Sequence, residues 1–220
     1  MTSIDVPFPG NQGTAALAID AEGTILGIYF DANGNRQVYL RSRDGVFTAV
    51  HPPGDVSGTV AESINNCGAL SGFFIDSNSV YRGFLRQADG SIVSFEAPLA
   101  GTGSGQGTLP SVEFQQGSHN ALNERGDLVG SAVDANYTAH GFLRTHDGEF
   151  FSFDLPQGVG SYNGTVPSSI NSTGTIVGSS FDDNDGGHGF VRYPDGKLVP
   201  FDAPGAVPAL GGTSTDLPFT

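Results

Sequence analysis

The sequence has 220 residues, with 23 acidic against nine basic side chains and a net charge of −14, which disfavours nucleic acid and anionic membrane surfaces as partners because neither would meet a basic patch. The single cysteine, Cys67, excludes an internal disulfide. No apolar stretch approaches membrane-spanning length, and Met1 leads into the polar residues 2–5 rather than a basic and apolar leader, so we expect no membrane insertion and no signal peptide.

One pattern recurs four times along the chain. Each copy holds Asx-x-x-Gly, a further glycine, an aromatic-aliphatic-Arg triplet and an Asp-Gly pair, and successive copies are offset by 45, 58 and 48 residues. The first position of the pattern is occupied by Asp20, Asn65, Asn123 and Asn171. The arginine of the triplet is Arg41, Arg86, Arg144 and Arg192. A period in this range indicates an array of supersecondary units.

The second copy illustrates what each repeat is expected to build. Four short runs rich in Phe, Val, Ile and Tyr alternate with turns, and the runs cover residues 61–65, 69–75, 81–86 and 91–97. The turns carry glycine, which accepts a positive φ, and Asp-Gly between two such runs is a strong hairpin signal. No stretch keeps a 3.6-residue period, so we expect four antiparallel strands per repeat and almost no helix.

Four antiparallel strands in each repeat of this length are the pattern of a β-propeller blade. We therefore predict one all-β domain over residues 1–220, a propeller with repeats at 13–57, 58–106, 107–163 and 164–211. The partial strands at 1–12 and 212–220 would help to close the ring. Four blades are favoured, because a fifth blade would lack its middle hairpin. Five blades are the alternative. The main rival is a β-helix, whose parallel coils would not need an Asp-Gly hairpin in every copy.

The repeat resembles a bacterial family, the HAF repeat, named for a His-Ala-Phe motif. The resemblance covers residues 13 to 205 and is clearest where a histidine precedes Gly-Phe, at His140 and His188. Gln37 and Arg82 replace that histidine in the first two copies, so it is not expected to be an obligatory ligand. The resemblance implies the propeller-like architecture and an extracellular or periplasmic location, and it implies no defined activity.

Two functions are open. The favoured one is a module that binds a small molecule, a glycan or an extracellular partner, because four equivalent surfaces with an aromatic residue suit repeated modest contacts; these aromatics are Tyr39, Phe84, Phe142 and Phe190. The alternative is an enzyme, a hydrolase, lyase or cyclase, whose site would lie at the central channel near the irregular third repeat. The oligomeric state is open.

The candidate site residues are those that break the internal symmetry. On the predicted innermost strands, equivalent positions carry Leu17, Glu62, Asn120 and Ser168, and an insertion over residues 99–118 precedes His119. His119 would serve as general acid or base, Glu62 or Glu113 would orient it, and Asn120 would stabilise oxyanion charge. The simpler interpretation is that these polar side chains line a wet channel.

Further candidates follow from the same argument. Glu62 and Asp216 could hold a divalent cation such as calcium, which prefers carboxylate oxygens. Ser168, Asp216 and Arg125 are expected ligand-binding residues. The repeated Asx residues are expected to close their own turns by bonding nearby backbone amides. The repeated arginines are expected to pair with acidic residues of the next blade.

Overall fold

In the computed structural model, residues 6–110, 120–155, 164–181 and 187–202 are described, and every regular element among them is a β-strand. The strands are β1 Thr14–Ile19, β2 Ile25–Phe30, β3 Arg36–Arg41, β4 Phe47–Val50, β5 Thr59–Ile64, β6 Leu70–Ile75, β7 Tyr81–Arg86, β8 Ile92–Phe95, β9 Gly107–Leu109, β10 Leu128–Val133, β11 Ala139–Arg144, β12 Phe150–Phe153, β13 Thr165–Ile170, β14 Ile176–Phe181, β15 Gly187–Arg192 and β16 Leu198–Phe201. The predicted all-β class is confirmed. Across these ranges, no helix long and apolar enough to cross a membrane is found.

The strands form four units in chain order, which we call unit 1 (β1–β4), unit 2 (β5–β8), unit 3 (β9–β12) and unit 4 (β13–β16). Within each unit, consecutive strands pair antiparallel. Units 1 and 4 are separate four-stranded sheets, whereas units 2 and 3 are joined into one sheet by a parallel bridge between Gly107 of β9 and Tyr81 of β7.

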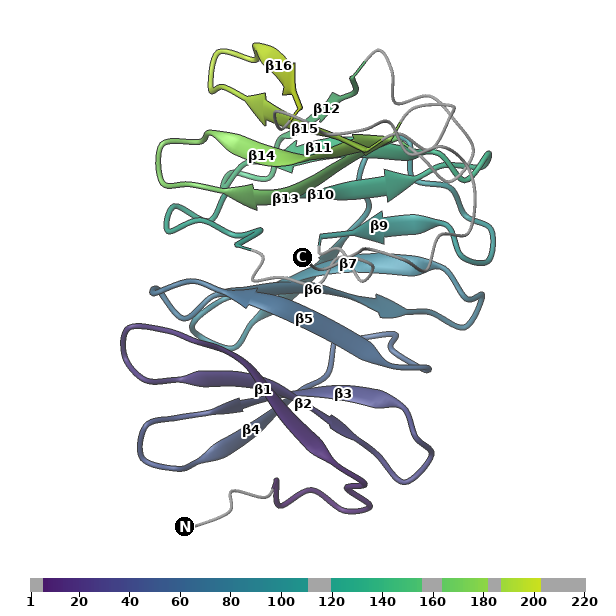
Figure 1. Ribbon diagram of the computed structural model, residues 1–220. Helices are drawn as coiled ribbons and strands as arrows, with labels where there is room; N and C mark the ends of the chain where they lie inside the picture. The colour runs from purple at the N-terminus through teal and green to yellow at the C-terminus, as the bar shows by residue number, and fades with distance from the viewer. Residues whose placement is uncertain (1–5, 111–119, 156–163, 182–186, 203–220) are drawn as a thin grey trace, which may run out of the picture.

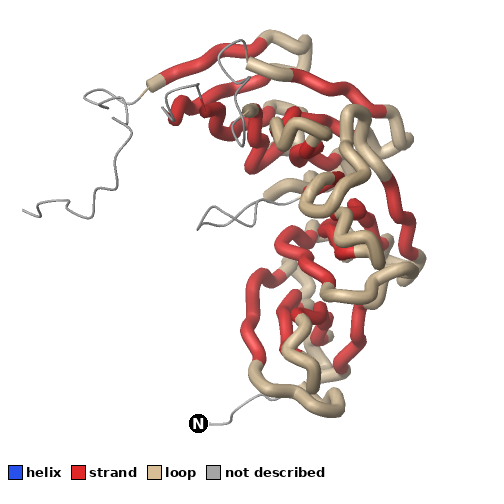
Figure 2. Tube along the Cα trace, turned by 90° about the vertical axis from the view of Figure 1, so that its right-hand side faces the viewer, coloured by secondary structure: helices blue, strands red, loops and turns tan. Residues whose placement is uncertain are grey.

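The four units follow one another along a curve, as Figure 1 shows, with unit 1 at one end and unit 4 at the other. Figure 2, turned by 90°, shows that the curve leaves one side open. None of the described sheets closes on itself. The partial strands predicted to close a ring are residues 1–12 and 212–220. Residues 6–12 form no strand, and residues 1–5 and 212–220 lie outside the described residues.

The Asx-x-x-Gly segments form the turns that join the first two strands of each unit, as predicted. In unit 2 the Asn65 Oδ1 accepts hydrogen bonds from the amides of Cys67 (3.1 Å) and Ala69 (3.0 Å). Gly68 closes the turn with φ 77°, a left-handed conformation that glycine adopts without strain. The side chains of Asp20, Asn123 and Asn171 accept the equivalent amide bonds.

The same side chains also connect neighbouring units, a role that was not predicted. The Asn65 Nδ2 donates to the backbone oxygen of Asn123 (2.9 Å), and the Asn123 Nδ2 donates to that of Asn171 (3.1 Å). The side chain of Asp20, in unit 1, is a carboxylate and has no N–H group to donate. Units 1 and 2 are instead connected by the Ala21 amide, which donates to the Asn66 Oδ1 (2.8 Å).

Apolar side chains fill the spaces between units. The cluster between units 1 and 2 includes Leu26, Val38 and Leu70, and a larger one joins units 2, 3 and 4. The geometry that the four units share depends on a glycine in the second strand. In unit 2, a Cβ at Gly72 would overlap the Val60 backbone oxygen of the first strand. Gly27, Gly130 and Gly178 are in the same position relative to their own first strands.

The repeated arginines do not act as predicted. Arg144 lies over the rings of Phe95 and Phe150, with its Cζ 5.2 and 5.9 Å from the ring centroids, and Arg192 lies 5.0 Å above Phe153. Burial lowers the pKa of the Arg144 guanidinium. These arginines therefore pack on aromatic faces, where a cation–π contact partly offsets the loss of hydration, rather than on carboxylates of the next unit.

We predict that Asn65→Asp destabilises the protein by about 1–3 kcal/mol, the cost of leaving a buried polar group without its partner. The carboxylate would still close its own turn, but it would present an acceptor to the Asn123 backbone oxygen in place of a donor. Urea unfolding of the two proteins measures the difference. Asp31→Asn is the matched control, because Asp31 also closes a turn through its Oδ1, on the amides of Asn33 and Asn35. A shift no larger than that of the control would contradict the connecting role of Asn65.

Candidate functional site

The candidate positions on the first strands of units 1, 2 and 4 coincide with β-bulges in the backbone. The pairing register shifts between Ala16 and Ala18 in β1 and between Ala61 and Ser63 in β5, and the extra residues are Leu17 and Glu62. The same shift in β13 makes Ser168 the extra residue. Such bulges re-aim side chains and occur frequently beside functional sites. The Ser168 hydroxyl donates to the Val177 backbone oxygen (3.3 Å), so it is engaged within its own unit.

In unit 3 the first strand is interrupted at the place where the other units have the bulge. Leu109 pairs with Ser131, while Leu122 forms an isolated bridge with Leu128. Residues 99–110 lie within the described part of the chain. They contact unit 3, where the Gly101 amide donates to the Val133 backbone oxygen of β10 (2.8 Å). The predicted insertion over 99–118 therefore begins too early, because residues 107–109 of that range form β9, and residues 110–121 lie between β9 and Leu122.

The predicted catalytic group is not assembled by the described residues. The Asn120 backbone oxygen accepts the Ile170 amide (2.9 Å) and the Ser169 hydroxyl (3.4 Å), which makes it a link between units 3 and 4. His119, Glu113 and Asp216 lie outside the described residues, and so does the side chain of Glu62. Their predicted roles as catalytic residues and cation ligands stay predictions.

A cleft with unlike charged groups lies between units 3 and 4. It has a volume of about 250 Å³. Its walls come from the Asx turn of unit 3, the turn between β11 and β12, and the facing turns of unit 4. The lining residues are Arg125, Asp127, Leu143, Thr145, His146, Asp147, Ile170, Gly174, Arg192 and Pro194.

The centre of this site is the carboxylate of Asp127, whose side chain is only 6% exposed. One oxygen accepts the Asn123 Nδ2 (3.0 Å) and lies 2.6 Å from the Arg125 Nη2. The other accepts the backbone amide of His146 (3.1 Å). Burial raises the pKa of Asp127, but the hydrogen bonds from these three residues outweigh it and bring the pKa below its usual value. Asp127 is therefore a fixed negative charge at neutral pH.

His146 is positioned by this carboxylate. Its Nδ1 lies 3.3 Å from the Asp127 Oδ1, and its Nε2 lies 2.7 Å from the Asp147 Oδ1. The imidazole is 61% exposed and Asp147 is equally exposed, so solvent and ligands reach the ring. A histidine whose Nδ1 faces a buried carboxylate is the arrangement that orients an imidazole for proton transfer at Nε2.

Two arginines supply positive charge to the same cleft. Arg125 is more than half exposed on the solvent side of Asp127, and an added Cβ at Gly174 would lie 3.2 Å from its Nη2. The turn itself requires glycine here, since Gly174 has φ 86°, and the missing side chain leaves space beside the Arg125 guanidinium. Arg192 is buried at the back of the cleft, and its Nε has no hydrogen-bond partner within the part of the chain that the structure describes. Arg125 was predicted to bind ligand, and it lines this cleft.

Asp127 and His146 were missed by the sequence analysis, although the signal was present. In the other three repeats the position of Asp127 is Thr24, Ala69 and Thr175, and the position of His146 is Arg43, Ala88 and Pro194. Both residues lie on turns, away from the strand positions at which Leu17, Glu62, Asn120 and Ser168 break the internal symmetry. The same comparison along the turns singles out both residues in the third repeat.

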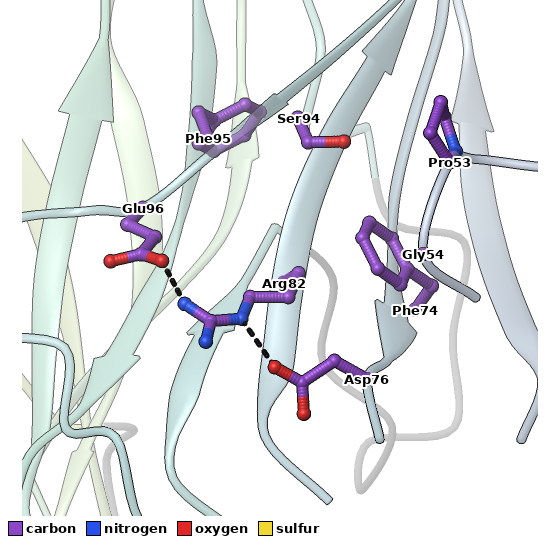
Figure 3. A pocket seen from close by; sticks show the side chains of 8 residues that line it. All are labelled: Pro53, Gly54, Phe74, Asp76, Arg82, Ser94, Phe95 and Glu96. Atoms are coloured by element: carbon purple, nitrogen blue, oxygen red, sulfur yellow. Dashed lines mark hydrogen bonds and ion pairs between the residues drawn. The ribbon is translucent and has the colours of Figure 1, made fainter. Parts of the chain in front are cut away.

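A second hollow, beside β7 and β8, has a different character. Figure 3 shows the Arg82 guanidinium between the carboxylates of Asp76 and Glu96, and its Nε lies 2.9 Å from the Asp76 Oδ2. The arrangement recurs in unit 3, where His140 lies 2.9 Å from Asp154 and 3.5 Å from Asp134. Because each basic group is held by carboxylates of its own unit and the pattern repeats, we assign these groups to the scaffold.

The scaffold histidine shows how strongly this pattern affects a titrating group. Burial lowers the pKa of His140, but the hydrogen bonds and charges of Asp154 and Asp134 outweigh burial and raise the pKa above its usual value. The two carboxylates thus favour the protonated form of His140, in the position that Arg82 occupies in unit 2. Among the described side chains, no group of three or more His, Cys, Asp or Glu is arranged to hold a metal ion.

Comparison with known proteins relates the fold to a class of enzymes. No protein-family model matches the sequence, and no curated protein matches it. Among solved structures, a streptogramin B lyase is 15% identical with a TM-score of 0.53 over 91% of this chain. A catalytically inactive histidine-to-alanine variant of virginiamycin B lyase from Staphylococcus aureus, solved with quinupristin, is also 15% identical, with a TM-score of 0.51 over the same share. The chain spans 58% of the length of each.

These likenesses show a propeller-like fold and correct the functional prediction. Virginiamycin B lyase is a β-propeller, and both solved structures named above are lyases. The favoured prediction, a ligand-binding module, is therefore wrong as the leading choice, and the enzyme alternative is the better supported one.

We predict that Asp127→Asn destabilises the protein by about 1.5–3 kcal/mol at neutral pH, the usual range for losing hydrogen bonds to a charged group. Since the pKa of Asp127 is lower in the folded state, its ionisation stabilises the fold above the unfolded value of about 3.9, and this contribution is lost as the pH falls through the folded pKa. The two proteins should accordingly approach each other in stability in acid. Urea midpoints measured from neutral to acid pH test this, with Asp147→Asn as the exposed control. A difference independent of pH would contradict it.

Proposed function

We propose that this chain acts as a propeller-type lyase, in which His146, Asp127 and the two cleft arginines form an acid–base site. The four units would be four-stranded blades of the ring. The observation that carries the proposal is the contact of the His146 imidazole with the buried carboxylate of Asp127, in a cleft that the other repeats do not reproduce. The lyase-like fold supports it.

The chemistry follows from the roles that these groups can take. A lyase breaks a bond by elimination. The exposed Asp147 carboxylate, 2.7 Å from the His146 Nε2, would first turn away to solvent. The freed Nε2 would take a proton from a carbon next to a carbonyl group, and the electrons of that C–H bond would form a C=C bond to the neighbouring carbon. The bond from that neighbouring carbon to an ester oxygen would break, and the ester would leave as a carboxylate. Loss of the proton from His146 to solvent would restore the base.

The arginines would stabilise the charge that the reaction develops. Removing the proton places negative charge on the carbonyl oxygen, and the leaving carboxylate is a second anion. Arg125 and Arg192 are donors on two sides of the cleft. Asp127 would hold the Nδ1 proton of His146 and stabilise the imidazolium that forms during the transfer.

A neutral cyclic ester fits the elimination, because its opening leaves both new groups on one molecule. Streptogramin antibiotics are candidate substrates only because the two similar solved structures are lyases of these compounds. The extracellular or periplasmic location and the HAF-repeat resemblance belong to the proposal as well, since the repeat pattern is what supports them.

We predict that the protein opens quinupristin or virginiamycin B to a linear product of unchanged mass, because elimination in a ring adds no atoms. His146→Gln should lower the rate by about 10²–10⁴-fold, the usual contribution of a general base. Liquid chromatography with mass spectrometry follows both. The control is His51→Gln, which changes an exposed histidine that does not line the cleft.

Two results would overturn the proposal. A product heavier by one water would identify a hydrolase instead. Failure of the wild-type protein to convert either compound would remove the lyase assignment. Equal activity of His146→Gln and the wild type would remove the role of His146.

A further inference from the structure

Arg192 differs from the equivalent arginines of the other units. In units 1, 2 and 3 the Nη1 of Arg41, Arg86 and Arg144 donates to the backbone oxygen of the following residue, at 3.5, 3.2 and 3.4 Å. Within the part of the chain that the structure describes, Arg192 makes no hydrogen bond and no ion pair. It is nevertheless buried, with 9% of its surface exposed, whereas the other three are only half-buried.

The environment of Arg192 offers its charge little compensation. Its guanidinium lies over the ring of Phe153. Burial lowers the pKa of Arg192, and the negative charge of Asp195, which is exposed, opposes that effect only in part. The Nε atoms of Arg41 and Arg144 also lack a partner, so the missing Nη1 bond is what distinguishes Arg192. A buried donor without an acceptor is costly, and an anionic ligand would supply the acceptor.

The position of Arg192 makes its guanidinium accessible to such a ligand. Arg192 lines the cleft between units 3 and 4. The other arginine of the cleft, Arg125, is already paired with the Asp127 carboxylate at 2.6 Å. Arg192 is therefore the cleft arginine that is left to bind a ligand.

The shape and charges of the cleft select among anions. A planar guanidinium binds a carboxylate through two parallel hydrogen bonds. Asp127 and Asp147 also line the cleft, so a singly charged acid is repelled less than a dianion such as sulfate. Leu143 and Ile170 give the cleft an apolar wall. Its volume of about 250 Å³ is below the usual range for drug-sized ligands, about 300–1,000 Å³, so it suits a small acid or one end of a larger molecule.

We propose that the cleft between units 3 and 4 is a binding site for a small monocarboxylic acid that carries an apolar group, held by the Arg192 guanidinium. This ligand class follows from the cleft itself. The role of the ligand rests on the proposed function, in which the ester leaves as a carboxylate. The new carboxylate of the product would stay on Arg192 and compete with the next substrate molecule, so the product and simple acids would inhibit the enzyme.

Isothermal titration calorimetry with sodium benzoate at constant ionic strength tests the site. We expect one benzoate to bind per chain, and benzamide, a neutral analogue of the same shape, to bind about tenfold more weakly or not at all. Arg192→Gln should weaken benzoate binding by about 10–100-fold, the range expected for losing hydrogen bonds to a charged group. Arg86→Gln is the matched control, because it removes the equivalent arginine of unit 2, which does not line the cleft.

Three results would each rule out the proposal. They are equal binding of benzoate and benzamide, unchanged benzoate binding by a folded Arg192→Gln protein, and tighter binding of sulfate or inorganic phosphate than of benzoate. Circular dichroism shows whether the variant is folded. If it is not, Arg192→Lys takes its place, since it keeps the charge but loses the planar pair of donors, and benzoate binding as tight as that of the wild type would count against the site.

Calorimetry needs no turnover, so this site and the lyase activity can fail separately. Benzoate binding that depends on Arg192, without conversion of quinupristin, would support the site and remove the lyase assignment. Conversion of quinupristin without benzoate binding would do the reverse. Where both hold, benzoate should inhibit the opening of quinupristin competitively, and inhibition that substrate does not relieve would contradict the retained product.

Discussion

The side chain at the first position of each repeat is the interaction on which the rest of the structure depends. Its Oδ1 closes the turn between the first two strands, and an asparagine Nδ2 at that position also donates to the next unit. One residue therefore sets both the shape of a unit and its placement relative to its neighbour. The bond from Asn65 is buried, so losing it leaves an unpaired polar group rather than one that water could satisfy.

This constraint also explains where the candidate site lies. The Nδ2 of Asn123 donates both to Asn171 in unit 4 and to the Asp127 carboxylate. The amide that fixes the two units thus fixes the charge that positions His146. A site at such a junction needs no separate support, because the scaffold already holds both walls of the cleft. Residues on the turns can then change while the frame remains constant, which is how the third repeat differs from the others.

The sequence predicted the local structure well and the assembly of units poorly. The strand runs, the Asx turns and the level of Glu62 and Ser168 followed from repetition, because equivalent residues have equivalent backbones. The open curve and the link from Asn65 to Asn123 depend on how one unit lies on the next, which a period does not encode. The repeated arginines were assigned carboxylate partners because charge was considered without the aromatic faces beside them. Comparison of the turns would have found Asp127 and His146.

The cleft is less acidic than the protein as a whole, because its two arginines balance the carboxylates of Asp127 and Asp147, and this difference constrains the substrate. A net charge of −14 opposes the approach of an anion, yet Arg125 and Arg192 present positive charge inside the cleft. Arg125 is already paired with Asp127, and burial lowers the pKa of Arg192, a sign that its environment disfavours charge without a partner. Such a site gains most when an anion forms within it. Binding a neutral substrate and stabilising the negative charge of the reaction is the differential binding on which catalysis depends.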